Sequence, residues 1–113
     1  MEYGDIPLRR RAVLKELGLL EKEEALAHYA VVDEYHQLKH GRFVRWVNLD
    51  PERIVVTNGA IVIKTEIRED GLLVTVKTIN GKFFWSFKFN EVVLFQKLSA
   101  EELVLLEAIE LGR

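Results

Sequence analysis

The fold is decided by residues 58–89, NGAIVIKTEIREDGLLVTVKTINGKFFWSFKF. Three dipeptides within it, Asn58-Gly59, Asp70-Gly71 and Asn80-Gly81, each separate two runs of apolar, β-branched or aromatic residues. Such dipeptides favour the tight turns whose twist matches that of antiparallel strands. The stretch therefore predicts an antiparallel meander with a hairpin turn at each dipeptide.

Alternation of side chains predicts which face of each strand is buried. Over residues 60–68, Ile61, Ile63 and Ile67 alternate with charged side chains, so we expect these isoleucines on one face. The strands that follow alternate in the same way, with one row of Leu72, Val74 and Val76 and another of Phe83, Trp85, Phe87 and Phe89. Phe84 faces away from the second row. Further strands are expected over 42–48, 54–57 and 92–95, with Pro51 interrupting the first two.

Helical segments flank the meander. Pro7 in a first turn and Gly18 at the end predict a helix from about residue 6 to 17. Apolar residues recurring every three positions predict a second helix over 21–39. Ser99 and Glu102 form a capping box, which predicts a last helix running to about residue 111, with Leu103, Leu106 and Ile109 buried and the two leucines packed onto the sheet.

These elements predict an α+β fold in one domain. It comprises a helical segment over 1–41, a five- or six-stranded meander over 42–98 and a C-terminal helix over 99–113. Short aromatic strands would leave long edges unpaired, so we expect the sheet to curl into a small, partly open barrel of the SH3-like type. A strongly bent sheet packed on helices is the alternative.

Composition narrows the function classes. The chain has 113 residues, a formal net charge of −2 and no cysteine. The missing cysteines exclude a disulfide framework and thiol chemistry. Basic side chains outnumber acidic ones over 42–98, and acidic ones predominate over 99–113. We expect a soluble protein inside the cell, in the cytoplasm, because no stretch resembles a signal peptide or a membrane span.

No pattern of residues predicts catalysis or cofactor binding. A helix over 21–39 would present Asp33, His36 and His40 on one face, but Gln37 stands where a zinc protease motif has glutamate. Ser86 has no glycine elbow or evident base near it, and no glycine-rich phosphate loop occurs. We therefore expect no enzyme activity, no cofactor and no metal.

Binding is the better-supported class. Basic and aromatic side chains gather around the first strand at Arg42, Arg45, Trp46 and Arg53, and Lys88 lies on an outward face of the meander. Cations interleaved with an aromatic ring suit single-stranded nucleic acid. The abundance of aromatic residues, including the outward Phe84, suits a protein partner or self-association instead. A protein-binding or assembly module is our first hypothesis, and nucleic-acid binding is the second.

Two segments carry a resemblance. Leu38-Lys39-His40-Gly41, followed by Arg45-Trp46, opens the β-rich part, and Phe95-Gln96-Lys97-Leu98 closes it before the last helix. This arrangement resembles small uncharacterised β-rich proteins of large DNA viruses over about residues 35–110. The resemblance implies no activity, cofactor or site residue.

Turns, caps and charge placement all agree with one fold. Such agreement is expected of thermophile, consensus or designed sequences. The sequence does not distinguish among these origins.

Overall fold

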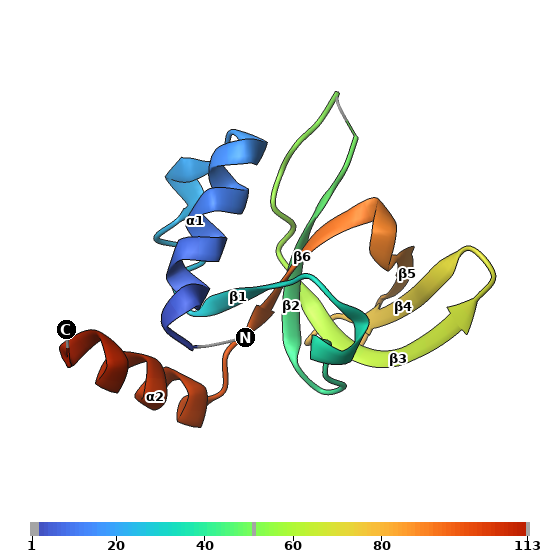
Figure 1. Ribbon diagram of the computed structural model, residues 1–113. Coiled ribbons are helices and arrows are strands. Elements are labelled where there is room, and N and C mark those ends of the chain that lie inside the picture. The colour runs from blue at the N-terminus through green and yellow to red at the C-terminus, as the bar shows by residue number, and fades with distance from the viewer. Residues whose placement is uncertain (1–2, 51, 113) are drawn as a thin grey trace. The chain divides into compact units, whose positions relative to one another are not determined.

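The computed structural model describes residues 3–50 and 52–112, so the predicted strand break at Pro51 lies outside the described residues. The fold is α+β, with two α-helices and a six-stranded antiparallel sheet of order β1-β6-β2-β3-β4-β5 (Figure 1). The helices are α1 (Ile6–Leu17) and α2 (Ala100–Leu111). The strands are β1 (Tyr29–Val32), β2 (Phe43–Asn48), β3 (Ala60–Arg68), β4 (Gly71–Lys77), β5 (Phe84–Lys88) and β6 (Val92–Lys97). The sheet is not closed into a barrel, and the SH3-like prediction is not confirmed.

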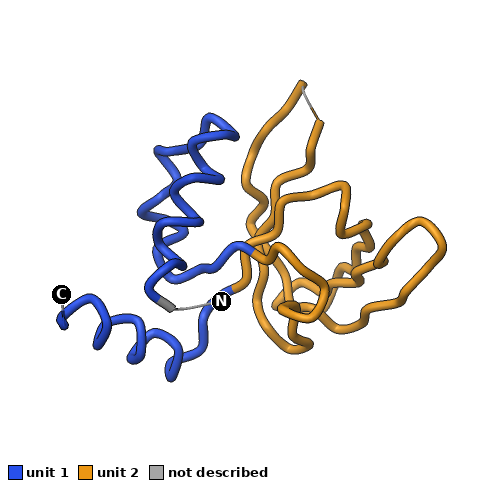
Figure 2. Tube along the Cα trace, viewed as in Figure 1, with its two compact units in different colours: residues 1–31, 97–113 blue, residues 32–96 orange. Residues whose placement is uncertain are grey.

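The chain forms two compact units, coloured separately in Figure 2. Unit 1 contains residues 1–31 and 97–113, and unit 2 contains residues 32–96. The predicted meander, residues 42–98, overlaps most of unit 2. The two ends of the chain belong together in unit 1.

Unit 1 confirms both predicted end helices. α1 is followed by Gly18, whose φ of 71° is the left-handed conformation that ends helices. At the start of α2, the Ser99 hydroxyl accepts from the Glu102 N–H at 3.1 Å, and the Ser99 N–H donates to the Glu102 carboxylate at 2.9 Å. Leu106 is buried as predicted and packs with Ile6 and Leu98, and Leu103 and Ala30 of β1 pack against the same cluster. Ile109 is exposed.

The predicted helix over residues 21–39 is wrong. This segment contains a 3₁₀ turn at Leu20–Lys22, strand β1, and a second 3₁₀ turn at Tyr35–Gln37. β-Branched Val31 and Val32 favour a strand, and both are buried there. Apolar residues at every third position are compatible with either element, so sheet pairing overrides the helical pattern.

The predicted hairpin turn at Asn58-Gly59 is also wrong. Residues 54–59 run back along β2, with a bridge between Val47 and Val56, and the chain reverses earlier, where the Arg53 N–H donates to the Asp50 carbonyl. Gly59 instead supports a close approach. Its φ is +97°, and a Cβ there would lie 2.6 Å from the Val44 carbonyl oxygen.

The other two hairpins are confirmed. Asp70-Gly71 connects β3 to β4, with Arg68 paired to Gly71. Asn80-Gly81 lies between β4 and β5, and the Asn80 side chain accepts hydrogen bonds from the Thr78 hydroxyl at 2.6 Å and the Lys82 N–H at 3.0 Å. These turns hold β3, β4 and β5 in consecutive antiparallel order.

The buried residues of unit 2 agree with the prediction for β4 but not with the prediction for β3. Leu72, Val74 and Val76 are buried as expected, whereas β3 buries Ala60 and Val62 instead of its isoleucines. A β-bulge between Val62 and Lys64 shifts the register with β4. Because a bulge inserts one residue, it changes which side chains face the core. The predicted face is therefore wrong before the bulge, where Ile61 lies opposite Lys77. After the bulge Ile67 lies opposite buried Leu72, as the alternation predicts, but it is 82% exposed.

Candidate functional site

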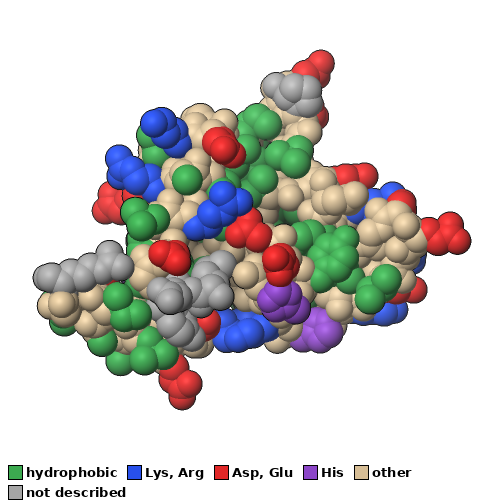
Figure 3. Space-filling model, in the orientation of Figure 1, with side chains coloured by type: hydrophobic (Ala, Val, Ile, Leu, Met, Phe, Trp, Pro, Cys, Tyr) green, Lys and Arg blue, Asp and Glu red, His purple; other side chains and the backbone are tan. Residues whose placement is uncertain are grey.

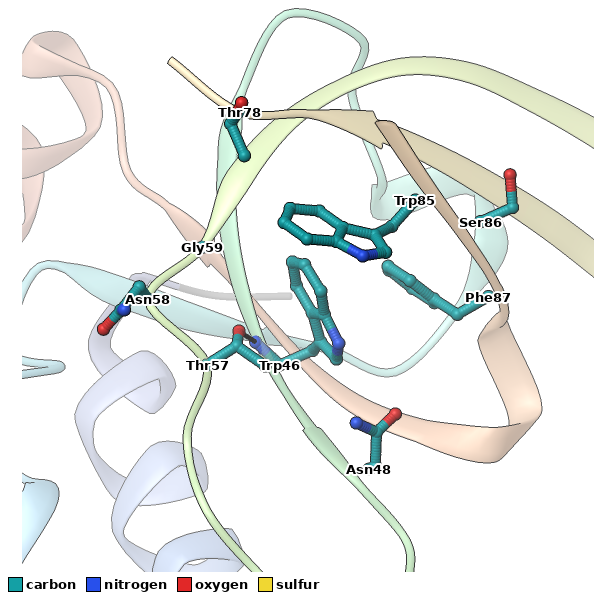
Figure 4. A pocket seen from close by; sticks show the side chains of 9 residues that line it. All are labelled: Trp46, Asn48, Thr57, Asn58, Gly59, Thr78, Trp85, Ser86 and Phe87. Atoms are coloured by element: carbon teal, nitrogen blue, oxygen red, sulfur yellow. Dashed lines mark hydrogen bonds between the residues drawn. The ribbon is translucent and has the colours of Figure 1, made fainter. Parts of the chain in front are cut away.

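Unit 2 has an aromatic pocket of about 500 Å³ on the inner face of its curled sheet. Three rings define it, those of Trp46 from β2 and of Trp85 and Phe87 from β5 (Figure 4). The remaining lining comes from Asn48, Thr57, Asn58, Gly59, Thr78 and Ser86. No charged side chain is among these described lining residues. The pocket therefore offers aromatic surface with neutral polar groups at its rim.

The pocket rings form two aromatic pairs, one between strands β2 and β5 and one between residues two positions apart in the chain. Those of Trp46 and Phe87 lie 4.8 Å apart at an interplanar angle of 30°. The Trp85 ring stacks on that of Phe83, with centroids 6.0 Å apart. Trp46 is only 7% exposed, whereas Trp85 is 50% exposed. Trp46 is therefore part of the core, and Trp85 exposes part of its ring to solvent.

Hydrogen bonds to Thr57 hold one wall of the pocket in place. Its N–H donates to the Trp46 carbonyl at 2.9 Å, and its hydroxyl accepts from the Trp46 N–H at 3.1 Å. Its carbonyl accepts from the Arg45 Nε at 2.8 Å. The close approach at Gly59 fixes the same segment against β2. Such bonding pre-organises the wall before any ligand arrives.

The backbone of β5 at Ser86 forms part of the pocket wall. Ser86 lines it, yet the Ser86 side chain points away from the three rings (Figure 4). The Ser86 hydroxyl is bonded to that of Thr75 at 2.9 Å, on the opposite face of the sheet. The backbone at Ser86 is therefore the part of this residue that faces the pocket.

The predicted basic cluster does not assemble around Trp46. Arg45 lies on the other face of β2 from the Trp46 ring, since successive strand residues alternate, and its guanidinium binds the Thr57 carbonyl. Arg42 is half-buried and accepts a main-chain bond from the Val62 N–H at 3.0 Å. Arg53 is exposed at the reversal near Asp50. None of the three lines the pocket.

The other two predicted residues lie on the outer face of β5. Phe84 is 59% exposed, and the Lys77 ammonium lies 5.6 Å from its ring centroid. Lys88 forms an ion pair with Asp70. The hydrogen bond from Lys88 lowers the pKa of Asp70 below its ordinary value of 3.8, and the same bond raises the pKa of Lys88.

The sequence prediction did not include several pocket residues as site residues. Trp85 and Phe87 were placed on one face by alternation, and this placement is consistent with their pairing to Val76 and Val74. Their nearness to Trp46 depends on sheet curvature, which no local pattern encodes. No sequence pattern marks Asn48 as a site residue. The Asn58-Gly59 pattern predicts a turn and therefore does not indicate that Asn58 lines a pocket.

The histidines do not form a metal site. The His36 Nδ1 lies 3.2 Å from a Glu34 carboxylate oxygen, and the His40 Nε2 is bonded to the Thr65 hydroxyl at 3.0 Å. Within residues 3–50 and 52–112, no group of three or more potential ligands is close enough to hold a metal ion. The helical face that would have joined Asp33, His36 and His40 does not exist, because this segment is not helical.

One charged side chain of unit 1 is buried. Arg10 is 6% exposed, and its Nη1 donates to the Tyr29 carbonyl at 3.0 Å. Burial lowers the pKa of its guanidinium, and the carboxylates of Glu23 and Glu110 act in the opposite direction. The hydrogen bond links α1 to β1 within unit 1, which is a structural role.

The surface shows mixed charges, with blue and red side chains interspersed over the face seen in Figure 3. Hydrophobic side chains are visible on α2 at the lower left of that figure. The exposed apolar residues of α2 include Val104, Leu105 and Leu111. No helix in the described part of the chain is long and apolar enough to cross a membrane.

Comparison with known proteins gives no relative. No family model, no curated protein and no solved structure matches the chain. The site must therefore be interpreted from its own geometry.

Proposed function

We propose that the protein is a non-catalytic protein-binding or assembly module. Its contact surface consists of the aromatic pocket and the neighbouring edge of β5. The observation that carries this proposal is the meeting of Trp46, Trp85 and Phe87 in a pocket with an uncharged polar rim. Aromatic grooves and sheet edges are two common ways in which small β domains hold extended polypeptide.

The charges around the pocket favour polypeptide over nucleic acid. Phosphate-led binding needs Lys or Arg beside the stacking rings, and the described pocket lining has neither. Arg45 and Lys88 are engaged by the Thr57 carbonyl and Asp70. Single-stranded nucleic acid remains the alternative function, with Trp85 as its stacking surface.

A peptide selection tests the proposal. Dilute, immobilised chain is used to select from a displayed library of random linear peptides, and selected peptides are titrated against the chain in solution. Both tryptophans of the sequence lie in the pocket, so binding is expected to change the intrinsic tryptophan emission. Trp85→Ala should abolish binding because it removes the exposed ring.

Ile67→Ala is the control, since Ile67 is an exposed apolar residue of β3 that belongs neither to the pocket lining nor to the β5 edge. We expect the variant to bind the selected peptides with a dissociation constant within about threefold of that of the parent chain. A tenfold change would correspond to about 1.4 kcal/mol of binding free energy. A selection that enriches no peptide, or peptides that bind Trp85→Ala unchanged, would contradict peptide binding at the aromatic pocket.

Other predictions accompany this one. The contact between Trp46 and Phe87 supports a small, strongly curled sheet of the SH3-like type. The resemblance to β-rich viral proteins, the cytoplasmic location and the absence of enzyme activity remain predictions from the sequence.

A further inference from the structure

β5 lies at one end of the sheet, and no strand in the described ranges pairs with its outer edge. The Thr78 N–H donates to the Phe83 carbonyl at 3.0 Å, so the main chain at Phe83 faces β4. Hydrogen-bonding residues alternate along an antiparallel pair. Trp85 therefore also bonds toward β4, whereas Phe84, Ser86 and Lys88 direct their N–H and C=O groups outward.

We infer that a second copy of this chain pairs with that edge, β5 against β5 in antiparallel orientation, about a twofold axis at Ser86. This inference rests on the proposed function, because it names the occupant of the contact surface. The outward groups lie symmetrically about Ser86, so each would meet a partner. Residues 84 and 88 of the two copies exchange hydrogen bonds, and the two Ser86 residues bond to each other.

The side chains match in this register. Phe84 lies opposite the second copy's Lys88, Trp85 opposite its Phe87, and Ser86 opposite its Ser86. These are cation–aromatic, aromatic–aromatic and hydroxyl–hydroxyl pairs, which stabilise neighbouring strands. Two of them extend contacts already present on the outer face, namely Lys77 over Phe84 and Thr75 with Ser86.

The two neighbouring registers match less well. An axis at Trp85 would place Lys88 opposite the second copy's Lys82. An axis at Phe87 would place Phe84 opposite the second copy's Asn90, beyond the end of β5. A twofold axis at Lys88 would place two like charges directly opposite each other, which is destabilising. An axis at Phe84 would pair only part of β5. Pairing about Ser86 uses the whole of β5. It also covers part of the exposed rings of Phe84 and Trp85, which lie at the unpaired edge of this strand.

The test is the oligomeric state of the full chain by sedimentation velocity, from low micromolar to near-millimolar concentration. We expect a concentration-dependent monomer–dimer equilibrium. Ser86→Pro removes the central N–H donor, which faces away from β4, and proline is tolerated at such edge positions. It should stay monomeric throughout the range. Ser86→Thr retains both the N–H and a hydroxyl, so it should dimerise as the parent does.

Amide hydrogen exchange on the parent chain gives a second measurement that needs no variant. Raising the concentration should slow exchange at Phe84, Ser86 and Lys88, while the amides of Trp85 and Phe87 should be protected at every concentration. A chain that stays monomeric, a Ser86→Pro variant that folds and still dimerises, or unchanged exchange at Ser86 would overturn the inference.

The peptide selection remains decisive for the proposed function, because it uses immobilised chain at a dilution where copies do not meet. A monomeric chain that still selects peptides at Trp85 would refute self-pairing and support the binding module. A dimeric chain that selects none would support self-assembly and refute peptide binding.

Discussion

The rings of Trp46 on β2 and Phe87 on β5 lie 4.8 Å apart, although β3 and β4 separate these strands in the sheet. Strands that are separated by two others meet only when the sheet curls strongly, and the twist of β-strands allows such curvature. This contact joins the core of unit 2 to its aromatic pocket.

Trp46→Ala should destabilise unit 2 far more than Trp85→Ala. Truncating a buried tryptophan costs about 3–5 kcal/mol of unfolding free energy, and Trp46 belongs to the core cluster. Trp85 is half-exposed, so its loss should cost much less. Urea unfolding of both variants measures the difference; equal losses would show that Trp46 is not a core residue.

Gly59→Ala should cost more stability than Gly18→Ala. Both glycines have positive φ, and a non-glycine residue in the left-handed region costs about 1–2 kcal/mol. Only at Gly59 would the new Cβ also meet a main-chain oxygen, that of Val44. Chemical denaturation of the two variants provides the comparison. A smaller loss at Gly59 would mean that the segment is not held against β2.

Leu106→Ala should lower the free energy of unfolding by about 2–5 kcal/mol, as for other buried leucines. Leu106 packs with Ile6 and Leu98 and is 6% exposed. Leu105→Ala is the control, because the neighbouring Leu105 is 48% exposed and should have little effect. If thermal and urea unfolding do not separate the two variants, α2 is not docked within unit 1.

The ion pair between Asp70 and Lys88 should contribute to stability at neutral pH. Its hydrogen bond lowers the pKa of Asp70 below the ordinary value of 3.8, so the folded state binds fewer protons than the unfolded state in the acid range. The contribution is present above pH 3.8 and disappears as pH falls through the lowered pKa.

Asp70→Asn should therefore reduce stability at pH 7 and make stability less dependent on pH below about 4. Lys88 has a raised pKa, so its contribution disappears only as pH rises above 10.5 toward the raised value. Lys88→Met should reproduce the acid behaviour of Asp70→Asn in urea titrations over the same pH series. Acid profiles that match the parent chain would show that the pair is without energetic effect.

Oligonucleotide binding should be weak or absent. Phosphate contacts release counterions, so binding through them must weaken steeply as salt rises. Titration of oligothymidylate at two salt concentrations, followed by tryptophan emission, should give no salt-sensitive binding at micromolar protein. If binding does occur and Arg42→Ala, Arg45→Ala and Trp85→Ala each weaken it, nucleic-acid binding becomes the better function.

The sequence by itself determined the features that depend on a few neighbouring residues. Gly18 ends α1, Ser99 and Glu102 begin α2, and Asp70-Gly71 and Asn80-Gly81 make tight turns, because these are local backbone preferences and short-range hydrogen bonds. The alternation over β4 also predicts its buried residues correctly, because successive side chains of a strand point to opposite faces.

Tertiary structure decided the rest, because it depends on energies between distant residues. Pairing within the sheet made residues 29–32 a strand rather than part of a helix, and the bulge after Val62 changed the buried face of β3. Gly59 lies against the Val44 carbonyl of β2 instead of in a hairpin turn. Curvature brought Trp46 to Phe87 and formed the aromatic pocket, since the distance between strands far apart in the sheet is set by packing over the whole core and by no local pattern.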